Sequence, residues 1–226
     1  MRAHGYARDT WATYLVDLGR SEGEILADFT SAARNKINKC TRSGVHVEMV
    51  PSFEAFRNRY LEPYRTTKGL SVESAAYSDF YAKIFAHPNH DQYYRYGVAV
   101  DAVGTTLAVL GMSVFNGVAT EIMSAQMPEA VQRRIPAQDY LHCHMMFEAK
   151  KMGCRFFDLA GVNPHPIHPK EKGIRDFKEK WGGRYVEFHK FRKSSPTLFT
   201  RLIRVIRKRL GPAERLWKDI RSKSWN

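Results

Sequence analysis

The sequence has few cysteines and no long apolar run. Its three cysteines, Cys40, Cys143 and Cys154, form no CxxC pair. This pattern excludes a disulfide-stapled scaffold and a cysteine-rich zinc module, and it fits a reducing compartment. No stretch approaches the roughly 18 consecutive apolar residues that a membrane-spanning helix needs. The first ten residues lack the apolar core of a secretory signal. We therefore expect a cytoplasmic protein.

The usual catalytic and phosphate-binding motifs are also missing. The sequence contains no GxSxG, GxxxxGK[ST], GxGxxG or HExxH pattern. Among nine histidines, His142 and His144 are two residues apart in a predicted helix and do not share a face. His165 and His168 lie in a proline-rich segment without a clear third ligand. Because a metal site needs three or four convergent ligands, we expect none.

The remaining composition is that of one ordinary globular domain. The chain has 226 residues, of which 43% are hydrophobic and 12% aromatic, so it can build a substantial core. Its formal charge of +13 is concentrated near the C-terminus, where 12 basic and two acidic residues follow position 189. A protein with such an excess is suited to a polyanionic partner.

A basic amphipathic helix is predicted in this C-terminal region. Leu198, Leu202, Val205 and Ile206 share one face of a helix that Gly211-Pro212 ends. The arginine and lysine side chains face away. The helix can dock on the core through its apolar face, bind tRNA phosphate or bind an anionic membrane surface, and composition does not choose among these. Attachment to the periphery of a membrane therefore stays open.

The order of predicted elements indicates an α/β (α+β) fold. Alternating and apolar runs predict strands, and capping signals with helical periodicity predict helices. The Asn116-Gly117 pair between two apolar runs is a strong hairpin signal and argues against a doubly wound sheet. We expect strands at residues 13–18, 45–50, 93–100, 106–115, 118–126, 154–159 and 184–188. We expect helices at 21–43, from 52 past 64, and at 71–86, 136–151 and 174–180, with a loop at 160–173.

The segment Gln132–Ala137 stands between a predicted strand and a predicted helix. In GNAT-type acetyltransferases this junction is a glycine-rich loop whose N–H groups hold the pyrophosphate of coenzyme A. Here the glycines are missing, and Pro136, which has no N–H, occupies one position. The strand, loop and helix are therefore retained, while the coenzyme A cradle is weakened.

A set of motifs in fixed order resembles the Fem-type (FemABX-like) aminoacyltransferases, a GNAT-like family. The pattern begins with a strand ending in Asp17-Leu18, a basic helix at Arg34–Ile37 and Gly44-Val45. It continues with Phe157–Gly161, and it ends with a segment from Gly173 through Phe177-Lys178 to Gly182-Gly183. The agreement covers roughly residues 14–190, and the motifs are more specific together than alone.

This resemblance implies a GNAT-like fold with a mixed, largely antiparallel sheet. It also implies transfer of an aminoacyl group from aminoacyl-tRNA to an amine, without a separate cofactor. By the same resemblance, Phe177 and Lys178 lie near the tRNA end and the reacting carbonyl. A lysine at that position can neutralise the oxyanion, and Phe177 can stack on the terminal adenine.

The candidate site residues follow from these motifs. Lys178 and Asp158 are the predicted catalytic residues. Asp158 can equally cap a strand end, and the basic residues can equally form a solvated face. The predicted contacts to substrate or tRNA are Phe177, Arg34, Lys36, Arg133, Arg134, Arg175, Trp181 and Gly161.

One departure concerns size, because Fem-type enzymes usually contain two GNAT-like domains. This chain has room for one, at residues 13–190, with an N-terminal extension at 1–12 and the basic tail at 191–226. The acceptor is therefore left open among a peptidoglycan precursor, an amino acid and a natural-product intermediate. Two other functions also stay open: an acyltransferase that uses coenzyme A or an acyl carrier protein, and a non-catalytic module that binds RNA or membrane.

Overall fold

The structure is a computed structural model that describes residues 6–70 and 75–193. Its contacts divide the chain into a large unit, residues 10–188, and a small unit made of residues 1–9 and 189–226. The predicted C-terminal helix lies outside the described residues. Within the described ranges, no helix is both long and apolar enough to cross a membrane.

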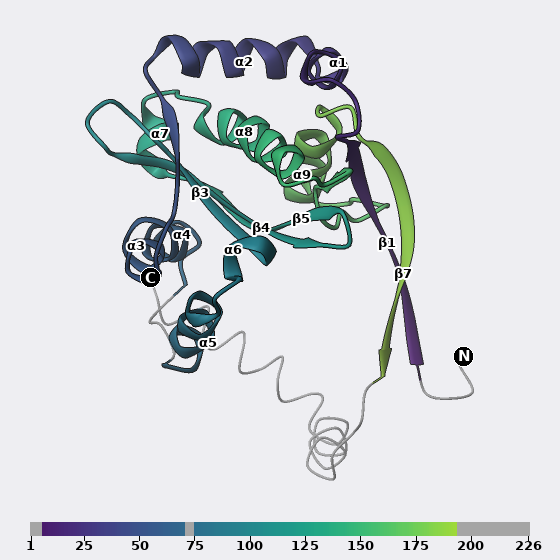
Figure 1. The fold of residues 1–226 in the computed structure, drawn as a ribbon. Coiled ribbons are helices and arrows are strands. Elements are labelled where there is room, and N and C mark those ends of the chain that lie inside the picture. The colour runs from purple at the N-terminus through teal and green to yellow at the C-terminus, as the bar shows by residue number, and fades with distance from the viewer. Residues whose placement is uncertain (1–5, 71–74, 194–226) are drawn as a thin grey trace, which may run out of the picture. The chain divides into compact units, whose positions relative to one another are not determined.

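A seven-stranded sheet forms the centre of the fold, as Figure 1 shows. The strands lie in the order β2-β3-β4-β5-β6-β1-β7. Neighbours pair antiparallel from β2 to β5 and between β6 and β1, whereas β5 and β6 pair parallel. The predicted mixed, largely antiparallel GNAT-like sheet is thus confirmed. The strands are β1 (Tyr6–Asp17), β2 (His46–Met49), β3 (Tyr94–Val100), β4 (Thr106–Phe115), β5 (Val118–Gln126), β6 (Phe156–Asp158) and β7 (Arg184–Lys193).

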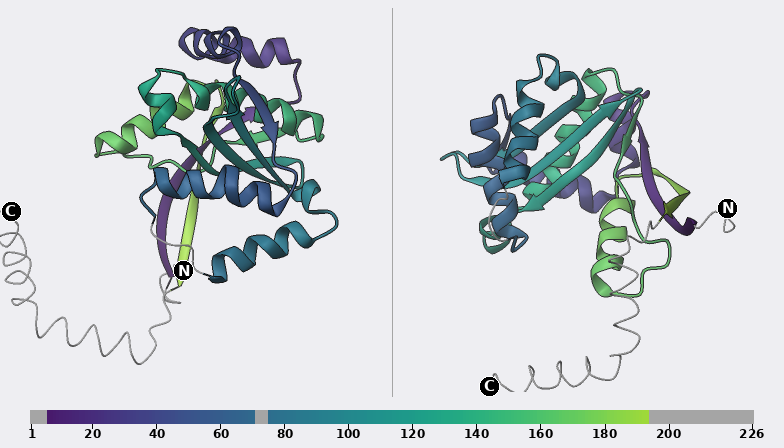
Figure 2. Two further views of the ribbon diagram at one scale, coloured as in Figure 1. Left: turned by 90° about the vertical axis from the view of Figure 1, so that its left-hand side faces the viewer. Right: turned by 90° about the horizontal axis from the view of Figure 1, so that it is seen from below.

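Helices cover both faces of this sheet (Figures 1 and 2). On one side α1 (Glu22–Asp28), α2 (Ser31–Arg42) and α8 (Ala137–Lys151) enclose the larger hydrophobic core. On the other side α3 (Phe53–Ala55), η2 (Phe56–Leu61), α4 (Glu62–Thr67) and α5 (Ala75–Ala86) enclose a smaller aromatic core. We call these the α8 face and the α5 face. The remaining helices are α6 (His90–Tyr93), α7 (Pro128–Gln132) and α9 (Pro169–Glu179).

Two glycines show how closely each face is packed. A Cβ added at Gly97 would lie 2.6 Å from Met145 Sδ in α8, and one added at Gly111 would lie 2.7 Å from the Tyr60 hydroxyl in η2. The two glycines therefore mark the opposite faces of β3 and β4. Along these two strands, successive side chains point to opposite faces of the sheet, so alternate residues pack into the α8-face core and the α5-face core.

Several predicted elements are confirmed with their physical signals. The hairpin at Asn116-Gly117 has positive φ at both residues, as this type of tight turn requires. The capping box at Ser21 and Glu24 forms as expected. Helix α8 begins directly after Pro136, which occupies the N-cap position, and runs to Lys151.

The predicted single helix at residues 21–43 is wrong. The structure has two helices, α1 and α2, because Thr30 caps a new helix by accepting a hydrogen bond from the Ala33 N–H. The extended Phe29 inserts its ring against Trp181, with ring centroids 4.9 Å apart. Burial of Phe29 in the core thus outweighs the local helical preference.

The predicted loop at residues 160–173 and the predicted ends of the following elements also need correction. Helix α9 begins already at Pro169, since proline is well suited to the first helical turn. Strand β7 extends to Lys193, and the short helix α7 occupies a segment with no predicted element.

Strands β5 and β6 pair in parallel over only a short stretch and then diverge, and the candidate site lies where they diverge. The pairing ends at Thr120 and Asp158, whereas β5 continues through residues 121–126. A bulge in β5, beside Gly111 and Met112, redirects the strand at this point. After β6 the chain turns at Ala160, whose φ is +61°. We call the resulting divergence of the two strands the β5–β6 gap.

Candidate functional site

Lys178 extends from α9 towards the β5–β6 gap. Its side chain is buried, with 9% of the residue exposed. Its Nζ donates hydrogen bonds to the carbonyl oxygens of Ala160 (3.2 Å) and Gly161 (3.3 Å). An ammonium group has three N–H donors, so one remains for another acceptor.

Two opposing effects act on the pKa of the Lys178 ammonium group. Burial lowers the pKa of its ammonium group, and the nearby carboxylates of Glu121 and Asp158 act against that effect. The net pKa lies below its ordinary value. Lys178 is therefore a cation whose proton is less tightly held than that of a surface lysine.

Asp158 ends β6 and is held by one of its two carboxylate oxygens. Its Oδ1 accepts the hydroxyl of Thr13 and the N–H of Ala160, the latter at 2.8 Å. The Thr13 hydroxyl also lies 2.9 Å from the Ala160 carbonyl oxygen. In the described part of the chain no hydrogen bond reaches Oδ2. Asp158 is thus oriented by one oxygen and presents the other.

A buried polar pair, Glu121 and His142, lies beside Lys178. His142 Nε2 is 3.3 Å from Glu121 Oε2, and its Nδ1 is 2.8 Å from the carbonyl oxygen of Gln138. Ser124 donates a hydrogen bond to the other oxygen of Glu121. Burial by itself raises the pKa of Glu121, but His142, Ser124 and Lys178 outweigh burial, so the net pKa is lowered.

Aromatic rings support this pair from the α8 face. The His142 ring stacks on Trp181, with centroids 5.6 Å apart, and meets Phe177 edge-on at 4.9 Å. The Lys180 ammonium lies over the Phe177 ring, 3.7 Å from its centroid. The rings therefore fix the orientation of the imidazole and shield it from water.

The Lys178 ammonium can stabilise a negative charge, and the neighbouring carboxylates and imidazole can accept a proton, all close to the β5–β6 gap. A partly desolvated ammonium, two carboxylates and an imidazole surround the point where two parallel strands separate. Within residues 6–70 and 75–193, no three His, Cys, Asp or Glu side chains converge as a metal site would need. Acyl transfer needs these properties, because an oxyanion develops and a nucleophile loses a proton.

A comparison with known families identifies the domain that carries these residues. The acetyltransferase (GNAT) domain family matches residues 27–179, more than half of the chain. The protein belongs to this family. No curated protein matches the sequence.

Three solved structures share the fold of this GNAT domain. FemX aligns with a TM-score of 0.63 at 13% identity, over 83% of this chain and 66% of FemX. L-PGS from Bacillus licheniformis aligns with a TM-score of 0.58 at 16% identity, over 91% and 67% of the two chains. The C-terminal domain (DUF2156) of a putative lysylphosphatidylglycerol synthetase from Agrobacterium fabrum aligns at 0.56 and 13%, over 91% and 68%. The chain thus spans about two thirds of each, and the predicted Fem-like GNAT fold is confirmed.

The residues before α8 do not fit the pyrophosphate of coenzyme A. Three N–H groups there, of Arg134, Ile135 and Ala137, donate to carbonyls within the same segment at 2.8–3.1 Å. The carboxylate of Asp139 occupies the first turn of α8 and forms an ion pair with Lys180. The positive end of the helix already holds an anion from the chain itself, and a pyrophosphate there would meet like charge.

The structure brings together five of the ten predicted site residues. Lys178, Asp158, Gly161, Phe177 and Trp181 surround or support the β5–β6 gap. Gly161 packs against Trp11, 3.1 Å from the position of an added Cβ. Trp181 is fully buried and underlies the site rather than lining its surface.

The predicted basic contacts lie elsewhere in this GNAT domain, and their roles towards tRNA stay predictions. Arg34 donates to the C-terminal carbonyls of α1, including that of Ala27 at 3.0 Å. Arg133 forms an ion pair with Asp101 at 2.6 Å and lowers the pKa of that carboxyl to about 2. The others are Lys36 (3.7 Å from Asp139), Arg134 (exposed, with positive φ) and Arg175 (over the Tyr185 ring).

Sequence reasoning missed Glu121, His142 and Asp139. In the sequence His142 stands two residues from His144 in a predicted helix, and nothing near it indicates a partner. A signal was present, because Glu121 interrupts a strand whose neighbours are mostly apolar. An acidic residue in the middle of a central strand is costly without a partner, and this points to a buried pair.

Proposed function

We propose that this domain is an N-aminoacyltransferase that moves an aminoacyl group from aminoacyl-tRNA to an amine. Membership of the GNAT family supports acyl transfer as the reaction class. The likeness in fold to FemX and to two structures of lysylphosphatidylglycerol synthetase type is consistent with an aminoacyl donor.

The observation that carries the choice of donor is the buried Asp139. Its carboxylate and the internally bonded amides occupy the place where a coenzyme A pyrophosphate would bind. An aminoacyl-tRNA needs no pyrophosphate site at this helix, because the phosphates of the tRNA are spread over a much larger surface. Lys36 and Lys39 on α2 lie beside this end of α8 and supply cations for such a surface.

The geometry assigns roles in the reaction to three residues. The acceptor nitrogen forms a bond to the ester carbonyl carbon, the bond from that carbon to the ribose oxygen breaks, and the proton from nitrogen ends on the ribose hydroxyl. The unused N–H of Lys178 stabilises the carbonyl oxygen as it becomes negative. Oδ2 of Asp158 accepts a hydrogen bond from the acceptor amine and orients it. Glu121 keeps Lys178 charged through its proximity.

A donor assay tests this proposal. The full chain is incubated with a pool of tRNA charged with labelled amino acids and with a panel of amines. RNase-treated tRNA and coenzyme A thioesters serve as controls. Label that moves from intact charged tRNA into an RNase-resistant amide supports the proposal, and label that moves from thioesters alone contradicts it.

The second candidate is an N-acyltransferase that uses coenzyme A. The family description as an acetyltransferase domain favours it. It requires the segment before α8 to open and Asp139 to leave Lys180. Protection of backbone amides at residues 134–138 from hydrogen exchange by coenzyme A would support this candidate, and unchanged exchange would oppose it.

A further inference from the structure

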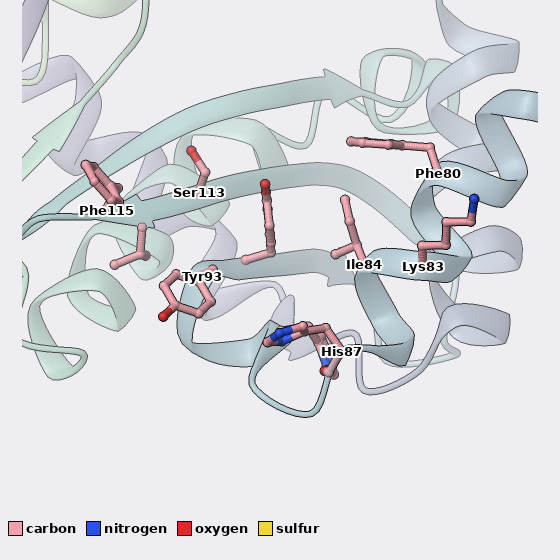
Figure 3. Close-up of a pocket in the computed structure, with 10 residues that line it drawn as sticks. Phe80, Lys83, Ile84, His87, Tyr93, Ser113 and Phe115 are labelled. Atoms are coloured by element: carbon pink, nitrogen blue, oxygen red, sulfur yellow. The ribbon is translucent and has the colours of Figure 1, made fainter.

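A cavity of about 680 Å³ lies on the α5 face of the sheet, apart from the Lys178 cluster. Figure 3 shows the lining residues Phe80, Lys83 and Ile84 on α5, and Ser113 and Phe115 on β4. The volume lies in the range typical of small-molecule sites. The lining residues are Phe80, Lys83, Ile84, His87, His90, Tyr93, Tyr94, Ser113, Val114 and Phe115.

Strand register connects this cavity to the candidate site. Ser113 is paired with Thr120, and Thr120 is paired with Asp158. Side chains that are directly opposite in neighbouring strands lie on the same face. Because strands are spaced about 4.8 Å apart, Ser113 and Asp158 are separated by about 10 Å across the sheet. The cavity therefore opens on the face where Asp158 projects, two strands away.

The lining has an apolar body and a basic rim. Phe80, Tyr93 and Phe115 are 55%, 47% and 79% exposed and line one cavity together, and a cluster of exposed large side chains of this kind marks a site of interaction more often than single ones do. Lys83 is exposed and has no ion pair within the described part of the chain. His87 Nδ1 accepts the N–H of Asn89 at 3.2 Å, so Nε2 is the ring nitrogen that carries a proton to donate. The lining includes no carboxylate.

We propose that this cavity binds the apolar body of the acceptor, an elongated amine that also carries an acidic group. The inference rests on the proposed function. The amine lies at Asp158, the carbon chain crosses Thr120 and Ser113, and the acidic group meets Lys83 and His87. A short amine cannot span about 10 Å and fill the cavity at the same time.

The two faces of the sheet then serve two substrates. The cations of α2 lie on the α8 face, where Lys36 is 3.7 Å from Asp139 of α8 and Lys39 binds the carbonyl of Arg134. The cavity lies on the α5 face. Lys178 lies near both Glu121, whose partner His142 belongs to α8, and Asp158, which shares a face with Ser113. In this proposal donor and acceptor therefore reach the reacting carbonyl from opposite sides.

The test measures binding without any donor, by isothermal titration of the full chain. The probes are 12-aminododecanoic acid, 6-aminohexanoic acid and dodecylamine. We expect the long amino acid to bind at least tenfold more tightly than the short one. Lys83→Ala should weaken binding of 12-aminododecanoic acid several-fold and leave that of dodecylamine unchanged. Equal affinities for the long and short amino acids would overturn the proposal.

A cavity-filling variant with a matched control locates the binding. Ser113→Trp should reduce affinity for 12-aminododecanoic acid at least tenfold, whereas Val103→Trp, at a residue 86% exposed, should not change it. In case Ser113→Trp does not fold, methyl NMR of the unmodified protein gives a second measurement. Ligand should shift the methyl signals of Ile84 and Val114 and not those of Ile135; shifts at Ile135 alone would contradict the proposed place.

The two proposals can fail separately. Long-chain binding in the cavity together with no transfer from charged tRNA removes the donor assignment and leaves the cavity assignment. Transfer from charged tRNA to short amines, with no binding of the long probes, removes the cavity assignment alone.

Discussion

Lys180 forms an ion pair with Asp139, and this contact joins the end of α9 to the first turn of α8. The side chains of Lys180 and Asp139 are only 13% and 6% exposed. Burial lowers the pKa of Lys180, and Asp139 acts against this. The pair places a carboxylate at the positive end of α8, where acetyltransferases of this fold need room for a phosphate.

Removing the charge of Asp139 should destabilise the protein. Asp139→Asn leaves the Lys180 ammonium buried without its counterion, and we expect a loss of about 3 kcal/mol in the free energy of unfolding by urea. Asp176→Asn, at an exposed position of α9, is the control and should change it by less than about 0.5 kcal/mol. Equal effects of the two substitutions would show that the pair contributes nothing.

Removing the ammonium of Lys178 should affect turnover rather than folding. Lys178→Met keeps an unbranched chain in the same space but removes the donor to the oxyanion, so we expect turnover to fall more than tenfold. Lys172→Met, at an exposed position of the same helix, should leave turnover unchanged. The measurement is the rate of label transfer, with circular dichroism as the check of folding. Unchanged turnover in Lys178→Met would refute the assigned role.

The lowered pKa of Lys178 predicts a dependence on pH with a defined sign. As pH rises through this lowered pKa the folded protein loses the charged ammonium, so turnover should fall before pH reaches the ordinary value of 10.5. In the same window the unfolded chain binds more protons than the folded one, so the stability should rise with pH. Lys178→Met should lack this rise. A rate that increases through this window would instead assign Lys178 as a base.

Replacing His142 should lower the free energy of unfolding, because the buried carboxylate of Glu121 loses a hydrogen-bond partner. His142→Phe keeps an aromatic ring on Trp181 but leaves Oε2 of Glu121 without its imidazole partner, at an expected cost of about 2 kcal/mol at neutral pH. The lowered pKa of Glu121 contributes stability above its ordinary value of 4.5, and this is lost as pH falls through the folded value. The variant should retain only the smaller part of that contribution that Ser124 and Lys178 supply, when stability is measured between about pH 3 and 6. His144→Phe, exposed on the same helix, should retain it.

Two glycines near the C-terminal end of the domain should respond oppositely to alanine. Gly182 has φ of +67°, and an added Cβ would lie 2.6 Å from the Asp28 carbonyl oxygen, so Gly182→Ala should cost more than about 1 kcal/mol. Gly173 lies in α9 with open space around it, so Gly173→Ala should stabilise by about 0.5–1 kcal/mol. Thermal unfolding of both variants provides the comparison, and a stabilised Gly182→Ala would contradict the close approach.

The sequence predicted those features whose cause is local. The hairpin at Asn116-Gly117 forms because these residues tolerate positive φ, and α8 begins directly after Pro136. The resemblance in motif order indicated the correct fold family and singled out Lys178 and Asp158, and the structure brings these two charges close enough to interact. The break at Thr30 was missed because burial of Phe29 against Trp181 depends on residues about 150 positions away.

By itself the sequence determined the mixed sheet and most of the strands and helices that build it. These follow from hydrophobic periodicity and turn chemistry, which act over a few residues. Lys178 and Asp158 are singled out by the resemblance in motif order, and their roles stay predictions. Only the tertiary structure decided that Glu121 meets His142, that Asp139 meets Lys180, and that Ser113 shares a face with Asp158. Each of these pairs is set by strand register and helix packing, since the free energy of burying a charge depends on partners that the chain brings together only when it folds.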